Sequence, residues 1–273
     1  MDIRIVNLFD AIPGYLDALC QAPGDADALW EAHVVAPHWP ELCCYAPFPL
    51  DGRKPAPCRD AAALERQLTA FSALNLPALQ AEFARIAAAL PNYDDDPITA
   101  ALCPHPAGDA DFIQRQNGVV GTSLFGNLLL CVDPLAPGWQ DWLPYVFAHE
   151  YHHTVWGNYW YNLHGGALTG AFVEALVIDG LADDFAMRLY PALRPQWVDP
   201  QTGDALLDEI YLPLLRRTDV DYPRYMFGGD GTDLPWCAGY AAGAALVRRM
   251  RAAHHNSSPR SLLETPPQQF LPA

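Results

Sequence analysis

The spacing of apolar residues predicts helices over most of the chain. Residues 1–90 read as a series of short helices, and Pro77 divides the Ala- and Leu-rich stretch from residue 60 to residue 90 into two of them. From residue 139 onward the apolar positions recur at helical spacing in four segments separated by Gly, Asn and Pro, which are residues 139–158, 166–191, 203–218 and 235–256.

Two stretches between these helical regions predict strands. Residues 96–105 form one, and residues 118–134 form another, in which Gly126 and Asn127 predict a bend or a bulge. A small sheet therefore precedes the helix at residues 139–158, and the expected fold class is α+β with helices dominating. We expect residues 1–95 to form a helical region that packs on a core domain of residues 96–273.

Composition and charge exclude several partners. The chain has 273 residues, of which 51% are apolar, so it is long and apolar enough to bury a core. Its net charge of −16 disfavours nucleic acid and anionic membrane surfaces, which bind through clustered Lys and Arg. No apolar run is long enough to span a membrane, the N-terminus lacks a secretory signal, and the seven cysteines have irregular spacing. We therefore expect a soluble, cytoplasmic protein.

The segment FAHEYHHTVWG, residues 147–157, contains candidate metal ligands. His149 and His153 are four residues apart, which places both imidazoles on one face of a helix. With Glu150 they form the pattern HExxH, in which two histidines bind zinc and the glutamate reaches the metal-bound water as general base. His152 is expected to pack at the flank of the site. A helix with a polar stripe is the alternative, but the preceding turn is strongly apolar.

The following helix offers a third ligand. A catalytic zinc usually has three protein ligands. Asp179 and Asp183 lie four residues apart on one helix face, so Asp179 can bind the metal while Asp183 holds the free ring nitrogen of a ligand histidine. Glu174 is the alternative ligand, although it lacks an acidic partner four residues on.

Three sequence blocks in this order resemble a bacterial family of predicted zinc-dependent proteases, known mostly as a domain of unknown function and similar to the gluzincin metallopeptidases. The blocks are AHEYHH, DGLADDFA and YMFG…LPWCAGYAAGAALV, and the resemblance covers roughly residues 118–265. The resemblance implies a zincin-like core. Asp179 stands where the family pattern has glutamate, which is one methylene longer, although an oxygen from either residue can bind zinc at about 2.0–2.2 Å.

The resemblance also implies a peptide-binding strand and an oxyanion donor. In gluzincins an edge strand above the metal pairs with the substrate, and the candidate here is the stretch 119–132, which a purely structural strand would equally explain. Tyr240 falls in the G-Y-x-x-G block, so its phenol is a candidate donor to the oxyanion; alternatively it caps a core in which Gly239 and Gly243 allow close helix packing.

These observations predict a zinc-dependent metallohydrolase, which we expect to be a peptidase acting on a peptide or protein. Zn²⁺ would be bound by His149, His153 and Asp179, with Glu150 and Tyr240 as catalytic residues. Two alternatives stay open: a non-catalytic relative that binds a peptide or a partner and keeps a structural zinc, and a hydrolase of non-peptide amides. Glu150 favours an enzyme, because a structural zinc site does not need it.

Overall fold

The computed structural model describes residues 2–166, 168–255 and 257–272. The chain forms two compact units, Met1–Thr154 and Val155–Ala273. The division falls inside a helix. The boundary that the sequence predicts between residues 95 and 96 stays a prediction. Helices dominate the described residues, which also form a small four-stranded sheet, and this confirms the α+β class.

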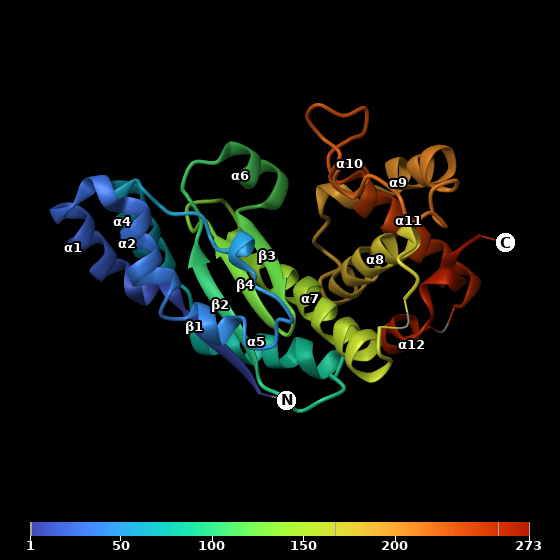
Figure 1. Cartoon of the computed structure of the whole chain (residues 1–273), viewed down its shortest axis with the longest axis horizontal. Coiled ribbons are helices and arrows are strands. Elements are labelled where there is room, and N and C mark those ends of the chain that lie inside the picture. The colour runs from blue at the N-terminus through green and yellow to red at the C-terminus, as the bar shows by residue number, and fades with distance from the viewer. Residues whose placement is uncertain (1, 167, 256, 273) are drawn as a thin grey trace. The chain divides into compact units, whose positions relative to one another are not determined.

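The sheet of the first unit has four strands in the order β1-β2-β4-β3 (Figure 1). Strand β2 lies parallel to both β1 and β4, and β3 lies antiparallel to β4, with Gly121 opposite Leu130. Strand β3 is therefore an edge strand that pairs, among the described residues, with β4 alone. The strands are β1 (Ile3–Asn7), β2 (Ile98–Pro104), β3 (Val119–Leu124) and β4 (Asn127–Val132).

The strand predicted at residues 96–105 is confirmed by β2, but two expectations about the sheet were wrong. The stretch 118–134 is a hairpin of two strands rather than one bent strand. The chain reverses at Phe125 and Gly126, whose φ angles of 61° and 140° form a tight turn. The N-terminal region is also not purely helical, because β1 pairs in parallel with β2 across some ninety intervening residues.

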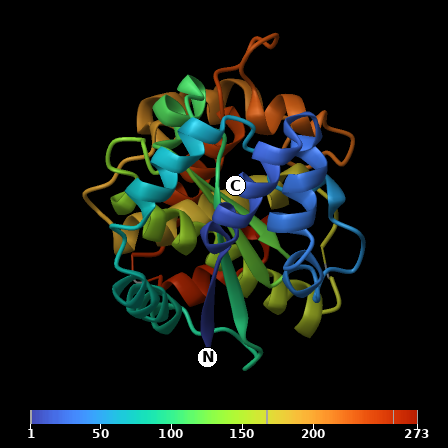
Figure 2. The ribbon, with the colours of Figure 1, turned by 90° about the vertical axis from the view of Figure 1, so that its left-hand side faces the viewer.

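One face of the sheet is covered by the N-terminal helices, which lie toward the viewer in Figure 2. Alternate side chains of the strands, such as Ala101, Cys103 and Leu129, form one apolar core with Tyr15 and Trp30 of these helices. The helices before β2 are α1 (Ile12–Gln21), α2 (Ala26–Trp30), which continues as a π-helical segment (Glu31–Val35), α3 (Trp39–Leu42), α4 (Ala61–Phe71) and α5 (Leu76–Ala89).

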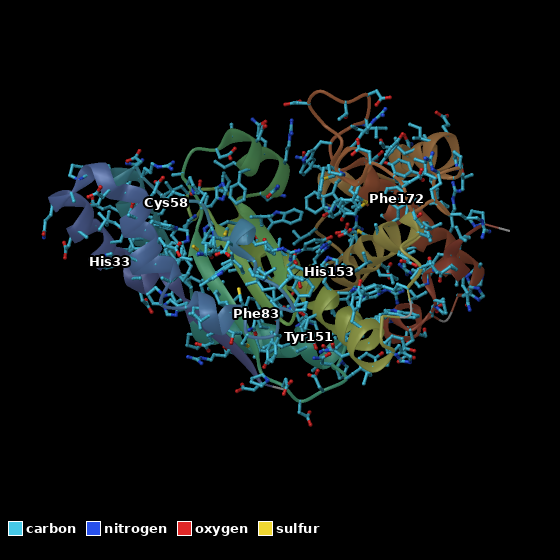
Figure 3. The ribbon with its side chains drawn as sticks, viewed as in Figure 1. His33, Cys58, Phe83, Tyr151, His153 and Phe172 are labelled. Carbon is cyan, nitrogen blue, oxygen red and sulfur yellow. The ribbon has the colours of Figure 1, made fainter. Side chains whose placement is uncertain are left out.

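Helix α5 packs against α7 (Trp139–Gly157), which contains the histidine motif. The ring of Phe83 in α5 stacks on Phe147 of α7 at a centroid distance of 3.7 Å. The hydroxyl of Tyr151 donates to the carbonyl of Leu90 at 2.8 Å, and Figure 3 labels Phe83, Tyr151 and His153. The break predicted at Pro77 is confirmed, since Pro77 lies in the first turn of α5. The part of α7 that lies in the first unit is thereby fixed to that unit. A further helix, α6 (Ala110–Gln116), precedes β3.

The second unit is helical in its described residues. Its helices are α8 (Phe172–Leu189), α9 (Pro200–Leu206), α10 (Tyr222–Phe227), α11 (Ala238–Ala253) and α12 (Pro259–Leu263). Helices α8 and α11 approach closely because Gly180 and Gly243 lie at their crossing, where a β-carbon at either residue would overlap the backbone of the other helix. Close packing thus explains one glycine in each of the blocks DGLADDFA and GYAAG.

Candidate metal centre and catalytic site

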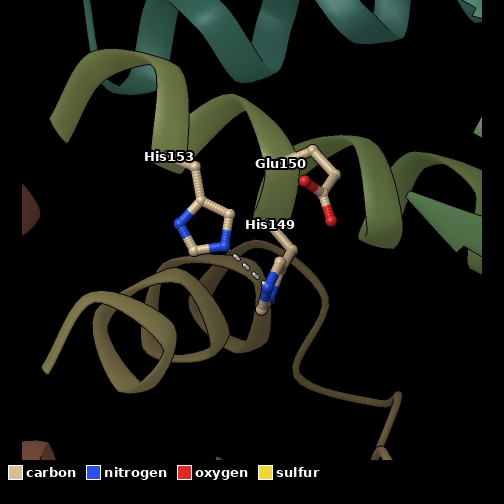
Figure 4. Close-up of side chains that lie close together, drawn as sticks. All are labelled: His149, Glu150 and His153. Carbon is tan, nitrogen blue, oxygen red and sulfur yellow. Dashed lines mark hydrogen bonds between the residues drawn. The ribbon is translucent and has the colours of Figure 1, made fainter. Parts of the chain in front are cut away.

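His149 and His153 lie one turn apart on α7 and face each other (Figure 4). Their Nε2 atoms are 3.1 Å apart, and the ring planes are nearly perpendicular at 85°. Two nitrogens bound to one tetrahedral zinc at about 2.0–2.1 Å would be roughly 3.3 Å apart. The observed separation therefore fits a pair of imidazoles that share a zinc ion.

Glu150 completes the cluster. The candidate ligand atoms of His149, Glu150 and His153 all lie within 4.8 Å of one another, and the side chains of His149 and Glu150 are mostly buried. Burial of a carboxylate next to two imidazoles is costly without partners, and a cation supplies one. The imidazole nitrogens of His149 and His153 are donors that zinc prefers, and the Glu150 carboxylate lies beside them.

Glu150 also contacts the edge strand. A β-carbon built at Gly121 of β3 would lie 2.7 Å from Oε1 and 2.8 Å from Cδ of Glu150, and closer still to Cγ. The glutamate therefore lies against the strand at a position where only glycine leaves room for it. Sequence reasoning missed the role of Gly121, although a glycine inside a strand is a known sign of close approach.

His152, between the two histidines of the cluster in sequence, is enclosed by the protein. It is 1% exposed, and burial, followed by the nearby imidazoles of His153 and His149, holds its pKa well below the usual value. A neutral, enclosed ring at this position agrees with a packing role at the flank of the motif.

Glu174, at the first turn of α8, already has a full set of hydrogen-bond donors in the second unit. Its Oε1 accepts from the backbone N–H and the hydroxyl of Thr169 and from Nε2 of Gln268, each at 2.7 Å. Its Oε2 accepts from the N–H of Gly170 at 2.9 Å. These hydrogen bonds connect the loop at residues 169–170 to the first turn of α8, as a capping box does. The Glu174 carboxylate thus stabilises the N-terminus of α8.

Other acidic side chains of α8 are buried as well. Asp179 is 6% exposed and Asp183 is fully enclosed. Asp183 Oδ2 accepts from the indole Nε1 of Trp197 at 3.0 Å. Asp184 forms ion pairs with Arg188 and Arg251. A buried carboxylate needs hydrogen-bond or ion-pair partners. The partners of Asp183 and Asp184 include side chains of the second unit.

Tyr240 lies half-buried in the first turn of α11, with its ring centroid 6.3 Å from that of Phe227. Within the first unit, therefore, the structure brings together His149, Glu150 and His153. Asp179, Asp183 and Tyr240 belong to the second unit, and their roles at the metal stay predictions.

Comparison with known proteins identifies the family. Residues 84–272, more than half of the chain, match the family described as "Predicted Zn-dependent protease (DUF2268)". The chain belongs to this family, as the three sequence blocks predicted. Zinc is the metal that the family description names, and the cluster of His149, Glu150 and His153 is compatible with it.

A curated relative matches over a shorter range. The chain is 33% identical over 125 residues to "Uncharacterized protein YjfC" of Bacillus subtilis (strain 168), and the aligned part is 41% of each protein. The match thus spans less than half the length of that relative. No solved structure matches the chain significantly. Among the described residues, no helix has both the length and the apolar character of a membrane span.

Proposed function

We propose that the chain is a zinc-dependent peptidase of the gluzincin type, with residues 96–273 as its peptidase domain. The observation that carries the proposal is the cluster on α7, where two imidazole nitrogens 3.1 Å apart adjoin a carboxylate that lies against an edge strand. This combination supplies metal ligands, a base and a backbone surface for a peptide within one unit.

His149, His153 and Asp179 are the proposed zinc ligands. Support for Asp179 over Glu174 comes from the four protein donors that already occupy the carboxylate of Glu174. A bound zinc supplies Lewis acidity, which polarises a carbonyl and lowers the pKa of a coordinated water. Asp183 is the proposed partner that orients a ligand histidine.

Glu150 is the proposed general base and then general acid. It follows His149 by one residue, about 100° around the helix, so its carboxylate can approach the attacking water from beside the ligand histidines. It takes a proton from that water and gives it to the leaving amine. Tyr240 is the proposed donor to the oxyanion that forms as the carbonyl is attacked.

Strand β3 is the proposed peptide-binding edge. The carbonyl of Ser123 accepts from Nη1 of Arg53, so it points away from β4. Backbone orientation alternates along an antiparallel strand, and Gly121 therefore turns its N–H and carbonyl to the same side. An extended peptide can pair with such an edge through main-chain hydrogen bonds whatever its side chains.

The experiment is to measure zinc content and cleavage of a mixed peptide library on the same preparation. We expect about one zinc per chain, and cleavage that stops on chelation and returns when zinc is added back. A protein that holds zinc but cleaves no peptide would contradict the peptidase and support a non-catalytic binding role.

A further inference from the structure

The guanidinium of Arg53 is held at one end of the proposed peptide-binding edge. Its Nη1 donates to the carbonyl of Ser123 at 2.5 Å, and its Cζ lies 5.4 Å from the centroid of the Phe125 ring at the hairpin turn. The side chain is exposed, and these two contacts hold its guanidinium beside Ser123 and the Phe125 ring. Arg53 lies outside the three sequence blocks, so nothing in the sequence singled it out.

Arg53 has no carboxylate partner among the described residues, whereas the adjacent Lys54 does. Lys54 pairs with Glu31 and Asp51, each at 2.9 Å. Acidic residues outnumber basic ones 32 to 16 in this chain, and yet none of the described ones pairs with Arg53. The positive charge of Arg53 is therefore available to bind another group. Guanidinium has five donors, and one of them is used by Ser123.

A peptide bound along β3 would span the distance between Arg53 and the proposed catalytic base, Glu150, with about two residues. Glu150 lies against Gly121, and Arg53 bonds to Ser123, two positions further along β3. Two residues of a strand span about 6.6–6.8 Å, and their backbone groups face the same way. A peptide paired with β3 at Gly121 therefore reaches the guanidinium of Arg53, which caps the Ser123 carbonyl, about two positions from the residue beside Glu150.

We propose that Arg53 determines specificity by binding a substrate carboxylate, about two residues from the cleaved bond. The proposal rests on the proposed function for its cleavage geometry. The carboxylate can belong to an acidic side chain or to the peptide's C-terminus, since a guanidinium binds either through paired hydrogen bonds. The net charge of −16 repels acidic peptides at long range, but salt screens that repulsion, and Arg53 acts locally.

The test uses short amidated peptides of constant neutral sequence in which a single Glu is moved from position to position. Each is paired with the same peptide carrying Gln, and one Gln peptide has a free C-terminal carboxylate. The ratio of kcat/KM for Glu and Gln is measured with the wild type, Arg53→Gln and a control, Arg66→Gln. Arg66 is an exposed arginine whose Nη1 donates to Ala62 of its own helix at 3.1 Å.

We expect Glu at one position, two residues from the cleaved bond, to raise kcat/KM about three- to tenfold over Gln. Arg53→Gln should bring that ratio to about one, while Arg66→Gln should keep it. An Arg53-dependent gain from the free C-terminus alone would identify the chain end as the carboxylate. A Glu preference that survives Arg53→Gln, or no preference anywhere, would overturn the proposal.

Binding separates this inference from the peptidase itself. The same peptides, labelled with a fluorophore, are titrated by anisotropy into Glu150→Gln and into Glu150→Gln combined with Arg53→Gln. Tighter binding of the carboxylate peptides that needs Arg53 supports the inference even if the wild type cleaves nothing. Equal Kd values for Glu, Gln and free-acid peptides in both proteins refute it even if the wild type is an active peptidase.

Discussion

Glu150 lies directly against Gly121 of the edge strand, where a side chain on residue 121 would strike it. A β-carbon at residue 121 would lie 2.7 Å from Oε1 and 2.8 Å from Cδ of Glu150. Hydrogen bonds and ring stacking fix the part of α7 that lies in the first unit, so the helix cannot easily retreat there. The absence of a side chain at Gly121 thus determines where the proposed base is held relative to the strand.

Gly121→Ala should displace the Glu150 carboxylate while leaving the histidine pair in place. We expect turnover to fall by about tenfold or more, because a misplaced base loses its alignment with the attacking water. Zinc content should be unchanged, since the three atoms nearest a β-carbon at residue 121 all belong to Glu150 and not to the histidines. Peptide cleavage and zinc content are measured side by side.

Gly24→Ala is the matched control for Gly121→Ala. A β-carbon at Gly24 meets nothing within 4 Å, so the same chemical change is made without a clash. This variant should cleave like the wild type. If Gly121→Ala also retains full turnover, the position of Glu150 against the strand has no part in catalysis.

Asp179→Ala should lose zinc, and Glu174→Ala should keep it. Asp179 is the proposed third ligand, whereas Glu174 is bound to Thr169, Gly170 and Gln268. Removing the Glu174 carboxylate should instead lower the free energy of unfolding by about 1–3 kcal/mol, because buried donors lose their acceptor. Zinc content and urea unfolding distinguish the two. Zinc loss in Glu174→Ala with retention in Asp179→Ala would move the ligand to Glu174.

His105 should make the protein less stable at mildly acidic pH. Burial lowers its pKa, although the nearby Asp109 carboxylate opposes the shift. Below the ordinary value of about 6.5, the unfolded chain takes up a proton that the folded His105 resists. The stability contributed by the neutral ring is thus complete above that pH and decreases as pH falls through the folded pKa.

The variant His105→Phe tests this pH dependence and preserves an aromatic ring against Phe112, which stacks on His105 at 3.7 Å. Urea unfolding is measured between about pH 7.5 and pH 5. The wild type should lose more stability than the variant as pH falls. Parallel curves would show that His105 does not titrate differently in the folded and unfolded states.

The helices and the motif could be predicted from the sequence because their signals are local. Pro77 marks the start of α5, and the spacing of His149 and His153 has meaning only on a helix. Strand β1 was missed because five residues that pair with a segment some ninety positions away have no local signal. The hairpin was taken for one strand because its turn has Phe125, rather than Asn or Asp, at a positive φ.

Features of the site that depend on three-dimensional packing could not be predicted from the sequence. The sequence favoured Asp179 over Glu174 only through the acidic partner four residues on, whereas the structure shows that the Glu174 carboxylate is hydrogen-bonded to Thr169, Gly170 and Gln268. Gly121 and Arg53 lie far from the motif in sequence, and only the fold brings the strand beside Glu150. The proposed roles of Gly121 and Arg53 follow from distances between atoms in the folded protein, which the spacing of residues along the chain does not give.

The most direct test of the central claim is the rate of peptide cleavage by Glu150→Gln, compared with the wild type at equal zinc content. The variant keeps the shape of the side chain and removes its charge. If Glu150 is the general base, the rate falls by at least about 100-fold while zinc and the thermal midpoint are retained. If the variant cleaves as fast as the wild type, Glu150 is not the base and the proposed mechanism is wrong.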